Sequence, residues 1–171
     1  MNRIMIIGQA GSGKSTLARD IGRRGNLPVV HIDLIHWKTG WIERTQAEKT
    51  PLVLDAIAQD RWVFEGGNST TYPQRIARAD TLIWLDLPAP LRLRRALWRS
   101  VKHYGSNRPD LPKGCPERLD PAFYHWIWRT RHSGRASLKN WFETAPPHLQ
   151  KYHLQSKHDV MRWVQNTFPD T

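Results

Sequence analysis

One stretch near the amino terminus limits the possible folds more than any other part of the sequence. Residues 8–15 read Gly-Gln-Ala-Gly-Ser-Gly-Lys-Ser and fit the pattern G-x-x-x-x-G-K-[ST] at every fixed position. Residues 3–7 before it, an Arg followed by four apolar residues, predict a short buried strand, and residues 15–23 after it predict a helix with one apolar face. A strand, a glycine-rich turn and a helix in this order are typical of a loop whose backbone N–H groups surround phosphate oxygens.

This pattern also assigns roles to single residues of the loop. We expect Lys14 to reach the β- and γ-phosphates of a nucleotide and the Ser15 hydroxyl to hold Mg²⁺. The sequence therefore predicts a site for ATP and Mg²⁺. Its cofactor-binding residues are predicted to be Gly8, Gln9, Ala10, Gly11, Ser12, Gly13, Lys14, Ser15 and Thr16.

Length and composition favour one domain. The chain has 171 residues, which is enough for one substantial core, and no apolar run is long enough to span a bilayer. Met1 leads straight into the first predicted strand, so we expect no signal peptide. Cys115 has no second cysteine to pair with. We therefore expect a single domain over residues 1–171 in the reducing cytoplasm.

The charge of the chain indicates an anionic partner. Twenty-six Lys and Arg stand against 15 Asp and Glu, for a formal net charge of +11. Nucleotide phosphates would account for part of this excess, and nucleic acid is the second possibility. An ordinary basic surface is the third.

Strand-like and helix-like segments alternate along the chain, which favours a parallel sheet covered by helices on both faces. Strands are predicted at residues 3–7, 28–32, 62–65, 81–86 and 152–154. A helix is expected within residues 45–59. It begins either after Thr45, with Glu48 completing a capping box, or after Thr50, with Pro51 in its first position. Residues 89–102 predict a further helix, and residues 104–119, with three Pro and two Gly, predict a loop.

Acidic side chains follow three of the predicted strands. Because ligands of open parallel sheets bind beyond the carboxyl ends of the strands, these residues are candidates for the site. Asp33 is expected to face the hydroxyl of a phosphoryl acceptor, and Glu65 to support the water shell of Mg²⁺ or the acceptor. Asp86 either belongs to the site or caps the helix that follows it.

Two groups of basic residues are candidates for binding phosphate. In the helix at 89–102 one face carries Arg92, Arg95, Arg99 and Lys102, and the other, expected to be buried, carries Leu93, Leu97 and Val101. These arginines either neutralise charge on a transferring phosphoryl group or form a solvated stripe. The second group comprises Arg129, Arg131, His132 and Arg135. It either closes a lid over about residues 103–135 or stabilises a helix dipole.

Further candidates surround the expected acceptor site. Arg75 follows the third predicted strand and would reach a substrate anion. Trp37 and Trp41 lie close to Asp33 in sequence and either stack on a base or plug this part of the core. The histidines have no metal-ligand spacing, and we expect no structural zinc site.

Several segments beyond the loop are distinctive. They are Ile-Asp-Leu-Ile-His-Trp at 32–37 with Gly40, Trp41 and Arg44, Trp-Val-Phe-Glu-Gly-Gly-Asn at 62–68, residues 79–88, Gly-Cys-Pro-Glu at 114–117 and Trp-Ile-Trp at 126–128. Together with the loop they resemble the P-loop small-molecule kinases, the group of adenylate kinase and shikimate kinase. More narrowly, they resemble the adenylate kinase-related proteins labelled DNA topology modulation proteins.

The resemblance implies an α/β P-loop NTPase fold, with a five-stranded parallel sheet in the order 2-3-1-4-5 flanked by helices and a mobile, helical, Arg-rich lid. It also implies binding of ATP with Mg²⁺ and a nucleotide kinase activity. In adenylate kinases the third strand ends in Asp-Gly-Phe-Pro-Arg, and that Arg contacts the acceptor. This chain has Glu-Gly-Gly-Asn at 65–68, and its nearest arginine is Arg75. The difference argues against AMP as the acceptor.

The resulting hypothesis is an ATP-dependent phosphotransferase acting on a nucleoside, a nucleoside monophosphate or another small acceptor. Its predicted catalytic residues are Lys14, Asp33, Arg95, Arg99, Arg131 and Arg135. Its predicted substrate-binding residues are Asp33, Trp37, Glu65, Asn68 and Arg75, and its predicted metal site is Ser15 with Glu65. Two alternatives stay open: a nucleic-acid-associated regulator with little or no kinase activity, and an ATPase coupled to a partner protein.

Overall fold

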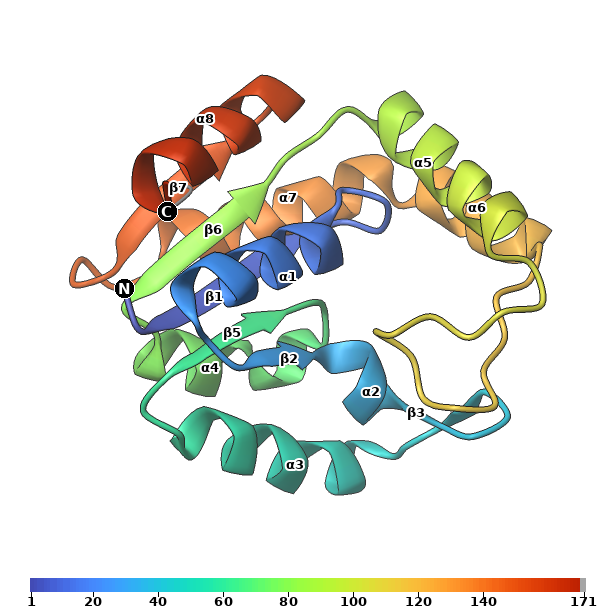
Figure 1. The fold of residues 1–171 in the computed structure, drawn as a ribbon, viewed down its shortest axis with the longest axis horizontal. Coiled ribbons are helices and arrows are strands. Elements are labelled where there is room, and N and C mark those ends of the chain that lie inside the picture. Colours follow the sequence, from blue (N-terminus) through green and yellow to red (C-terminus); the bar gives the residue numbers. More distant parts are fainter. Residues whose placement is uncertain (170–171) are drawn as a thin grey trace.

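Five parallel strands form the centre of the fold (Figure 1) in the computed structural model, which describes residues 1–169. Along the sheet their order is β2-β5-β1-β6-β7. Counted along the chain within this sheet, that order is 2-3-1-4-5, which confirms the predicted topology. The strands are β1 (Arg3–Gly8), β2 (Val29–His31), β5 (Trp62–Glu65), β6 (Thr81–Leu85) and β7 (Gln150–Leu154).

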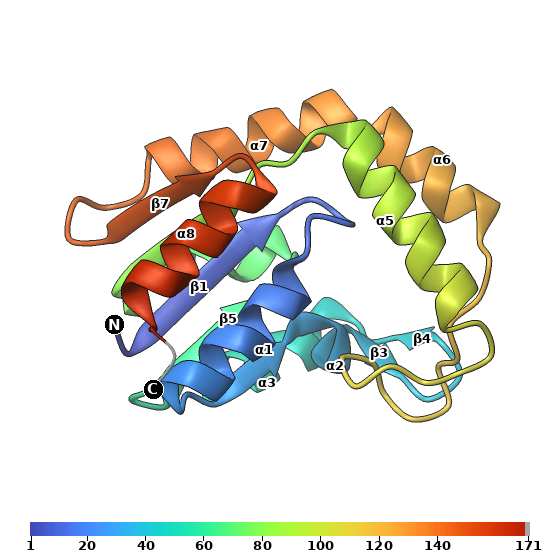
Figure 2. The same ribbon diagram turned by 45° about the horizontal axis from the view of Figure 1, so that its top comes forward.

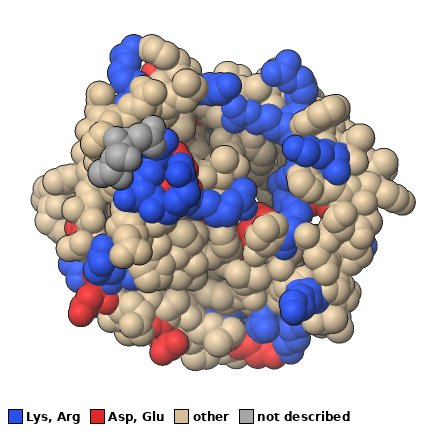
Figure 3. Space-filling view, in the orientation of Figure 1, with Lys and Arg blue, Asp and Glu red and all other residues tan. Residues whose placement is uncertain are grey.

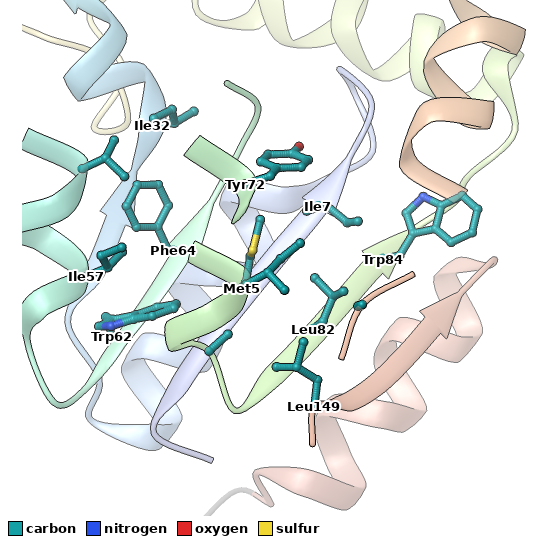
Figure 4. Packing of buried hydrophobic residues seen from close by; sticks show 14 of the residues in the cluster. Met5, Ile7, Ile32, Ile57, Trp62, Phe64, Tyr72, Leu82, Trp84 and Leu149 are labelled. Carbon is teal, nitrogen blue, oxygen red and sulfur yellow. The ribbon is translucent and has the colours of Figure 1, made fainter. Parts of the chain in front are cut away.

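Helices cover both faces of the sheet (Figures 1 and 2). On one face lie α1 (Lys14–Gly25) and α8 (Lys157–Thr167), and on the other lie α3 (Gln46–Ala58), α4 (Tyr72–Arg78) and α7 (Arg131–Glu143). Side chains of a strand alternate between the two faces, so neighbouring residues of β1 enter different cores. Ile4 and Ile6 pack with α1 and α8, whereas Met5 and Ile7 belong to the cluster of Trp62, Phe64 and Trp84 (Figure 4).

Side-chain caps define the beginnings of three helices. The Thr45 hydroxyl accepts a hydrogen bond from the Glu48 amide, and the Glu48 carboxylate accepts one from the Thr45 amide. The first of the two predicted starts for α3 is therefore correct, and Pro51 lies inside the helix. Asp120 caps α6 (Pro121–Arg129), and Ser156 with Asp159 forms a second capping box at α8.

The structure adds short elements that the sequence pattern did not reveal. They are α2 (Ile32–His36), a small hairpin of β3 (Trp37–Lys38) and β4 (Ile42–Glu43), and a 3-10 turn at Ser69–Thr71 that leads into α4. Two-residue strands and single helical turns are shorter than the periodicities from which secondary structure is inferred. Their position matters because Asp33 lies in the first turn of α2 and the hairpin directly follows that helix.

The helix α5 (Ala89–Lys102) stands beside the phosphate loop and lies away from the sheet (Figure 2). Its buried residues are Arg92, Ala96 and Ser100. The prediction that Leu97 and Val101 face a core is wrong, since they are 38% and 57% exposed. The reason is that α5 turns its polar face towards the loop, so its apolar face has only α6 beside it.

Residues 104–119, which we call the strap, connect α5 to α6 and contact the β3–β4 hairpin. The Gly40 amide donates to the Gly114 carbonyl at 3.0 Å. The Cys115 thiol donates to the Lys38 carbonyl at 3.2 Å, and the Trp41 indole N–H donates to Pro116 at 3.3 Å. The strap therefore bridges α5 and the hairpin. No helix within residues 1–169 has the length and apolar character needed to cross a membrane.

Candidate functional site

The phosphate loop between β1 and α1 depends on two glycines with left-handed backbone geometry. Gly11 has a φ of 77°, and a Cβ built there would lie 2.2 Å from the Arg92 carbonyl oxygen. Gly13 has a φ of 96° and forms the N-cap of α1. Any larger residue at position 11 would both strain the backbone and collide with α5.

The loop presents unpaired hydrogen-bond donors. Within residues 1–169 the amides of Gly11 and Gly13 have no hydrogen-bond acceptor, and the buried Ser12 hydroxyl has no partner. The helix α1 begins at Lys14, so the amides of its first turn are also free. Unpaired donors at a helix N-terminus form a site for an anion.

Lys14 lies across the loop, and its ammonium group donates to the Gln9 carbonyl at 3.1 Å. Desolvation lowers the pKa of Lys14, the carboxylates of Glu65 and Asp33 oppose that shift, and Arg99 and Arg92 add to it. The structure therefore brings two acids and two arginines from separate elements to this lysine.

Glu65 and Asp33 come from neighbouring strand ends, as predicted from the topology. In the β2–β5 ladder His31 pairs with Glu65, and the His31 Nδ1 lies 2.7 Å from Glu65 Oε1. Glu65 is only 2% exposed. Asp33 follows in the first turn of α2, where burial, and after it the Glu65 charge, raises its pKa to about 6.

The arginines of α5 contact the loop. Arg92 donates to the carbonyls of Leu87 at 3.0 Å and Ala10 at 3.2 Å, and Arg95 donates to the Ser12 carbonyl at 3.4 Å. Arg99 lies deeper, and burial lowers its pKa. Arg92, absent from the predicted catalytic set, thus supports the loop backbone directly.

A cavity of about 330 Å³ opens beside the loop. Its walls are formed by Gln9, Asp86, Leu87, Pro88, Ala89, Arg92, Arg131, His132, Arg135 and Gln155. The Gln9 amide group donates to the Thr130 carbonyl at 3.1 Å, which joins the phosphate loop to the start of α7. In Figure 3, Lys and Arg side chains border the hollow between α1 and the α5–α6 pair.

Asp86 belongs to this cavity. Arg135 donates to its two oxygens at 2.8 Å each, and His153 Nε2 lies 3.0 Å from one of them. Burial alone would raise the pKa of Asp86, but these hydrogen bonds outweigh it and the pKa is lowered. The alternative in which Asp86 caps α5 is wrong, because no side chain caps that helix.

Arg131 lines the same cavity, although its guanidinium is held at the rim. It donates to the Trp128 carbonyl at 2.8 Å and lies 4.5 Å from the centroid of the Trp128 ring. Arg135 pairs with Asp86, which follows β6 on one side of β1 and its phosphate loop, whereas Asp33 and Glu65 come from the ends of β2 and β5 on the other side of β1.

Arg75 requires a correction. It is fully buried, and its guanidinium donates to the carbonyls of Gly66, Gly67 and Asn68. It also lies 4.7 Å from the Phe64 ring centroid, and burial lowers its pKa to about 10. Arg75 therefore holds the turn after β5 together and does not extend towards a substrate. Asn68 has a φ of 61° in this turn, and its side-chain Nδ2 is buried without a partner among the described residues.

The two tryptophans of the hairpin pack edge to face, with ring centroids 5.4 Å apart. Trp41 is held against the strap by its bond to Pro116 and by Arg118, which lies 5.3 Å from its ring centroid. Trp37 stays partly exposed. Trp41 is also partly exposed, so for both tryptophans the choice between stacking on a base and plugging the core stays open.

The strap contributes a group of buried charges that sequence reasoning missed. Arg108 lies 3.0 Å from Glu117 and 3.5 Å from Asp110, and the Ser100 hydroxyl donates to Glu117 at 2.7 Å. The charges of Arg108 and Asp110 both act on the pKa of Asp33. The strap has no periodicity, so the sequence gives no sign of which of its charged residues are buried together.

The residues predicted to hold Mg²⁺ fit that role unequally. Ser15 stands in the first turn of α1, next to the unpaired loop donors, and is partly exposed. Glu65 is occupied by His31. Within residues 1–169 no three His, Cys, Asp or Glu side chains form a metal-binding group, so a cation here would need ligands from a bound phosphate as well.

Solved structures with this fold cover nearly the whole chain. A shikimate kinase from Bacteroides thetaiotaomicron is 19% identical with a TM-score of 0.61, over 96% of this chain and 95% of that one. A shikimate kinase from Acinetobacter baumannii, in complex with shikimate, is 14% identical with a TM-score of 0.54, over 97% and 92%. A sugar kinase from Janibacter sp. is 14% identical with a TM-score of 0.53, over 99% and 96%.

These likenesses establish that the chain has the fold of the P-loop kinases. Neither the protein-family models nor the curated proteins give a match to it. The narrower resemblance to the DNA topology modulation proteins stays a prediction.

Proposed function

We propose that this chain is a kinase that transfers the γ-phosphate of ATP to a hydroxyl group of a small molecule. The observation that carries the proposal is the meeting of three groups from different elements: Lys14 of the phosphate loop, Asp33 after β2 and Arg99 of α5. A phosphate-binding lysine, an acid that can take a proton and a buried guanidinium are the parts that phosphoryl transfer to a hydroxyl requires.

The donor would occupy the side of the loop that faces α5 and α7. Free loop amides and Lys14 would bind the β- and γ-phosphates, and the cavity lined by Arg131 and Arg135 would take the nucleoside end. Mg²⁺, held by the Ser15 hydroxyl and the phosphates, would neutralise charge on the phosphate oxygens. Arg99 and Arg95 would add positive charge on the side of α5.

The acceptor would occupy the opposite side, next to Asp33. With a pKa of about 6, Asp33 is ionised at neutral pH and can accept the proton of the attacking hydroxyl. The strap and the hairpin close this side through their mutual hydrogen bonds. Exclusion of water there would favour transfer over hydrolysis of ATP.

Acceptor-dependent release of ADP tests this function. Lys14→Ala should reduce the rate at least ~100-fold, because the lysine charge is lost where phosphoryl charge develops. Lys157→Ala is the matched control, since Lys157 is exposed at the start of α8 and its variant should keep the full rate. Equal rates for the two variants would contradict the role of Lys14.

A nucleic-acid-binding role is the second candidate, and the distribution of charge favours it. Residues 89–135 carry eleven Lys and Arg against three Asp and Glu, whereas the rest of the chain carries 15 against 12. Trp98 and Tyr104 in the same region are 67% and 66% exposed. If this role holds, single-stranded DNA should bind with an affinity that falls steeply with salt and does not respond to ATP.

A further inference from the structure

The two sides of Lys14 differ in the charge that they offer to a ligand. On the side of α5 and α7 the cavity and the loop are bordered by Arg92, Arg95, Arg131 and Arg135, against one acid, Asp86, which pairs with Arg135. On the other side, the ends of β2 and β5 and the strap supply carboxylates: Asp33, Glu65, Asp110 and Glu117. We call this second region, formed by residues 29–78 and the strap, the acceptor side.

The cations of the acceptor side already have partners. Arg75 is used by three carbonyls of its own turn, and Arg44 donates to the carbonyls of Leu34 at 3.1 Å, Ile35 at 3.0 Å and Trp37 at 2.6 Å. The other paired cations and their partners are Lys38 with Glu48, Lys49 with Glu43, Arg61 with the Gly25 carbonyl, Arg78 with the Ile57 and Ala58 carbonyls, and Arg118 with Asp120.

The charges of Lys14, Arg108 and Arg99 act on Asp33. Of these three cations, Arg108 is the one that belongs to the acceptor side, and it is also engaged. Its side chain is 9% exposed, and those of its two partners, Asp110 and Glu117, are 7% exposed. Moving Arg108 to an incoming anion would leave the buried Asp110 with only Arg19, at 3.8 Å, and the buried Glu117 with only Arg99, at 3.7 Å. Lys113, exposed on the strap, is the one acceptor-side cation with neither an ion pair nor a hydrogen-bond acceptor for its side chain within residues 1–169.

An acceptor that carries a phosphate or carboxylate needs an unpaired cation at its binding site, since burying an uncompensated anion beside Asp33 and Glu65 is strongly unfavourable. A hydroxyl group has the opposite requirement, because it donates to a carboxylate. The acceptor side has carboxylates and no buried guanidinium to spare.

Resting on the proposed function, we propose that the acceptor is an uncharged polyhydroxylated molecule, of the sugar, polyol or nucleoside class, without phosphate or carboxylate groups. Its hydroxyl oxygen forms a bond to the γ-phosphorus while the bond from that phosphorus to the β,γ-bridging oxygen of ATP breaks. The hydroxyl proton passes to Asp33, and ADP leaves.

A panel of matched acceptors tests the proposal. Each pair shares a carbon skeleton and differs in charge: nucleosides against their 5′-monophosphates, hexoses against their 6-phosphates and uronic acids, and glycerol against glycerol 3-phosphate. The measurement is kcat/KM for ATP-dependent phosphorylation, with the product identified by phosphorus NMR. We expect the uncharged member of the productive pair to be preferred by ~100-fold or more.

Three variants examine the cause of this preference. Glu117→Gln keeps a partner for Ser100 but removes the negative charge beside Arg108 and Arg99, so it should narrow the preference by raising kcat/KM for the anionic member. Glu143→Gln, on exposed α7 surface, removes the same charge elsewhere and should leave the preference as it is. Lys113→Ala should also leave the preference for the uncharged acceptor unchanged.

Preference for the anionic member of a pair, or equal use of both members, would overturn the proposal. Phosphorylation of an anionic acceptor that is lost in Lys113→Ala would also overturn it. No transfer to any acceptor by protein that binds Mg·ATP would overturn the proposed function, and with it this inference. The two failures are distinguishable because the first shows a kinase with an anionic substrate and the second shows no kinase.

Discussion

The phosphate loop and the acceptor side are built by different means, although both meet at Lys14. The loop is one continuous segment, and its geometry follows from glycines at fixed spacing. The acceptor side combines the end of β2, the end of β5, the hairpin and the strap, which are distant in sequence. A local motif therefore specifies the donor site, whereas tertiary contacts specify the acceptor site.

The two regions also differ in how their charged groups are satisfied. The arginines of α5 donate to backbone carbonyls of the loop, while the loop amides stay free for an anion. On the acceptor side the cations except Lys113 have partners, and the Asp33 carboxylate accepts no hydrogen bond among residues 1–169. The phosphate loop is therefore suited to bind an anion, and the acceptor side is suited to bind a group that donates a hydrogen bond.

Of the changes predicted here, Gly11→Ala should have the largest effect, and that effect should fall on the phosphate loop and not on the acceptor side. Its Cβ would meet the Arg92 carbonyl at 2.2 Å, so the loop must move and Mg·ATP binding should be lost. Gly105→Ala is the matched control, because Gly105 has a similar φ of 72° and nothing within 4 Å of the added carbon. It should cost about 1–2 kcal/mol of stability and leave binding unchanged. Equal loss of binding in both variants would show that backbone strain alone explains the effect.

Asp33→Asn should affect only the acceptor side. We expect ATP affinity within about twofold of wild type and a fall in kcat of about 10²–10⁴-fold, because the amide cannot accept the hydroxyl proton. In the wild type, kcat/KM should fall as the pH drops through about 6, where the carboxylate becomes protonated. A profile that stays flat between pH 5 and 8 would contradict this role.

The smallest expected effect concerns stability. The folded-state pKa of Asp33, about 6, lies above its ordinary value of 3.8. The folded state thus binds this proton more tightly than the unfolded state, and the free energy of unfolding decreases as the pH rises through that window. Asp33→Asn should therefore raise Tm at pH 8 by about 2–4 °C. For a chain of this size, that shift corresponds to a gain of ~1 kcal/mol in the free energy of unfolding. At pH 4 thermal melts should show little difference, and a lower Tm at pH 8 would contradict the raised pKa.

The sheet and most of its helices could be predicted because they obey simple periodicities. Thr45 with Glu48 marked the start of α3 as a capping box, and the runs at β5 and β6 were long enough to identify as strands. Which face of α5 is buried could not be predicted. Helical spacing separates the arginines from the leucines, but it does not tell which of the two faces packs against the phosphate loop.

For the candidate site, topology placed Asp33 and Glu65 together because parallel strands end at one edge of the sheet. Arg75 was misread, since nearness in sequence to a strand end does not tell whether a guanidinium turns outward or caps carbonyls beneath it. Arg108 was missed because the strap folds by contacts with residues 38–41, and no local pattern encodes such contacts.

Calorimetric titration of the wild-type protein with Mg·ATP tests the central claim most directly, because every role assigned above depends on a triphosphate held by the loop. The account predicts one site, with heats of binding that persist in Asp33→Asn and disappear in Gly11→Ala. No binding to the wild-type protein, or equal binding to Gly11→Ala, would contradict it.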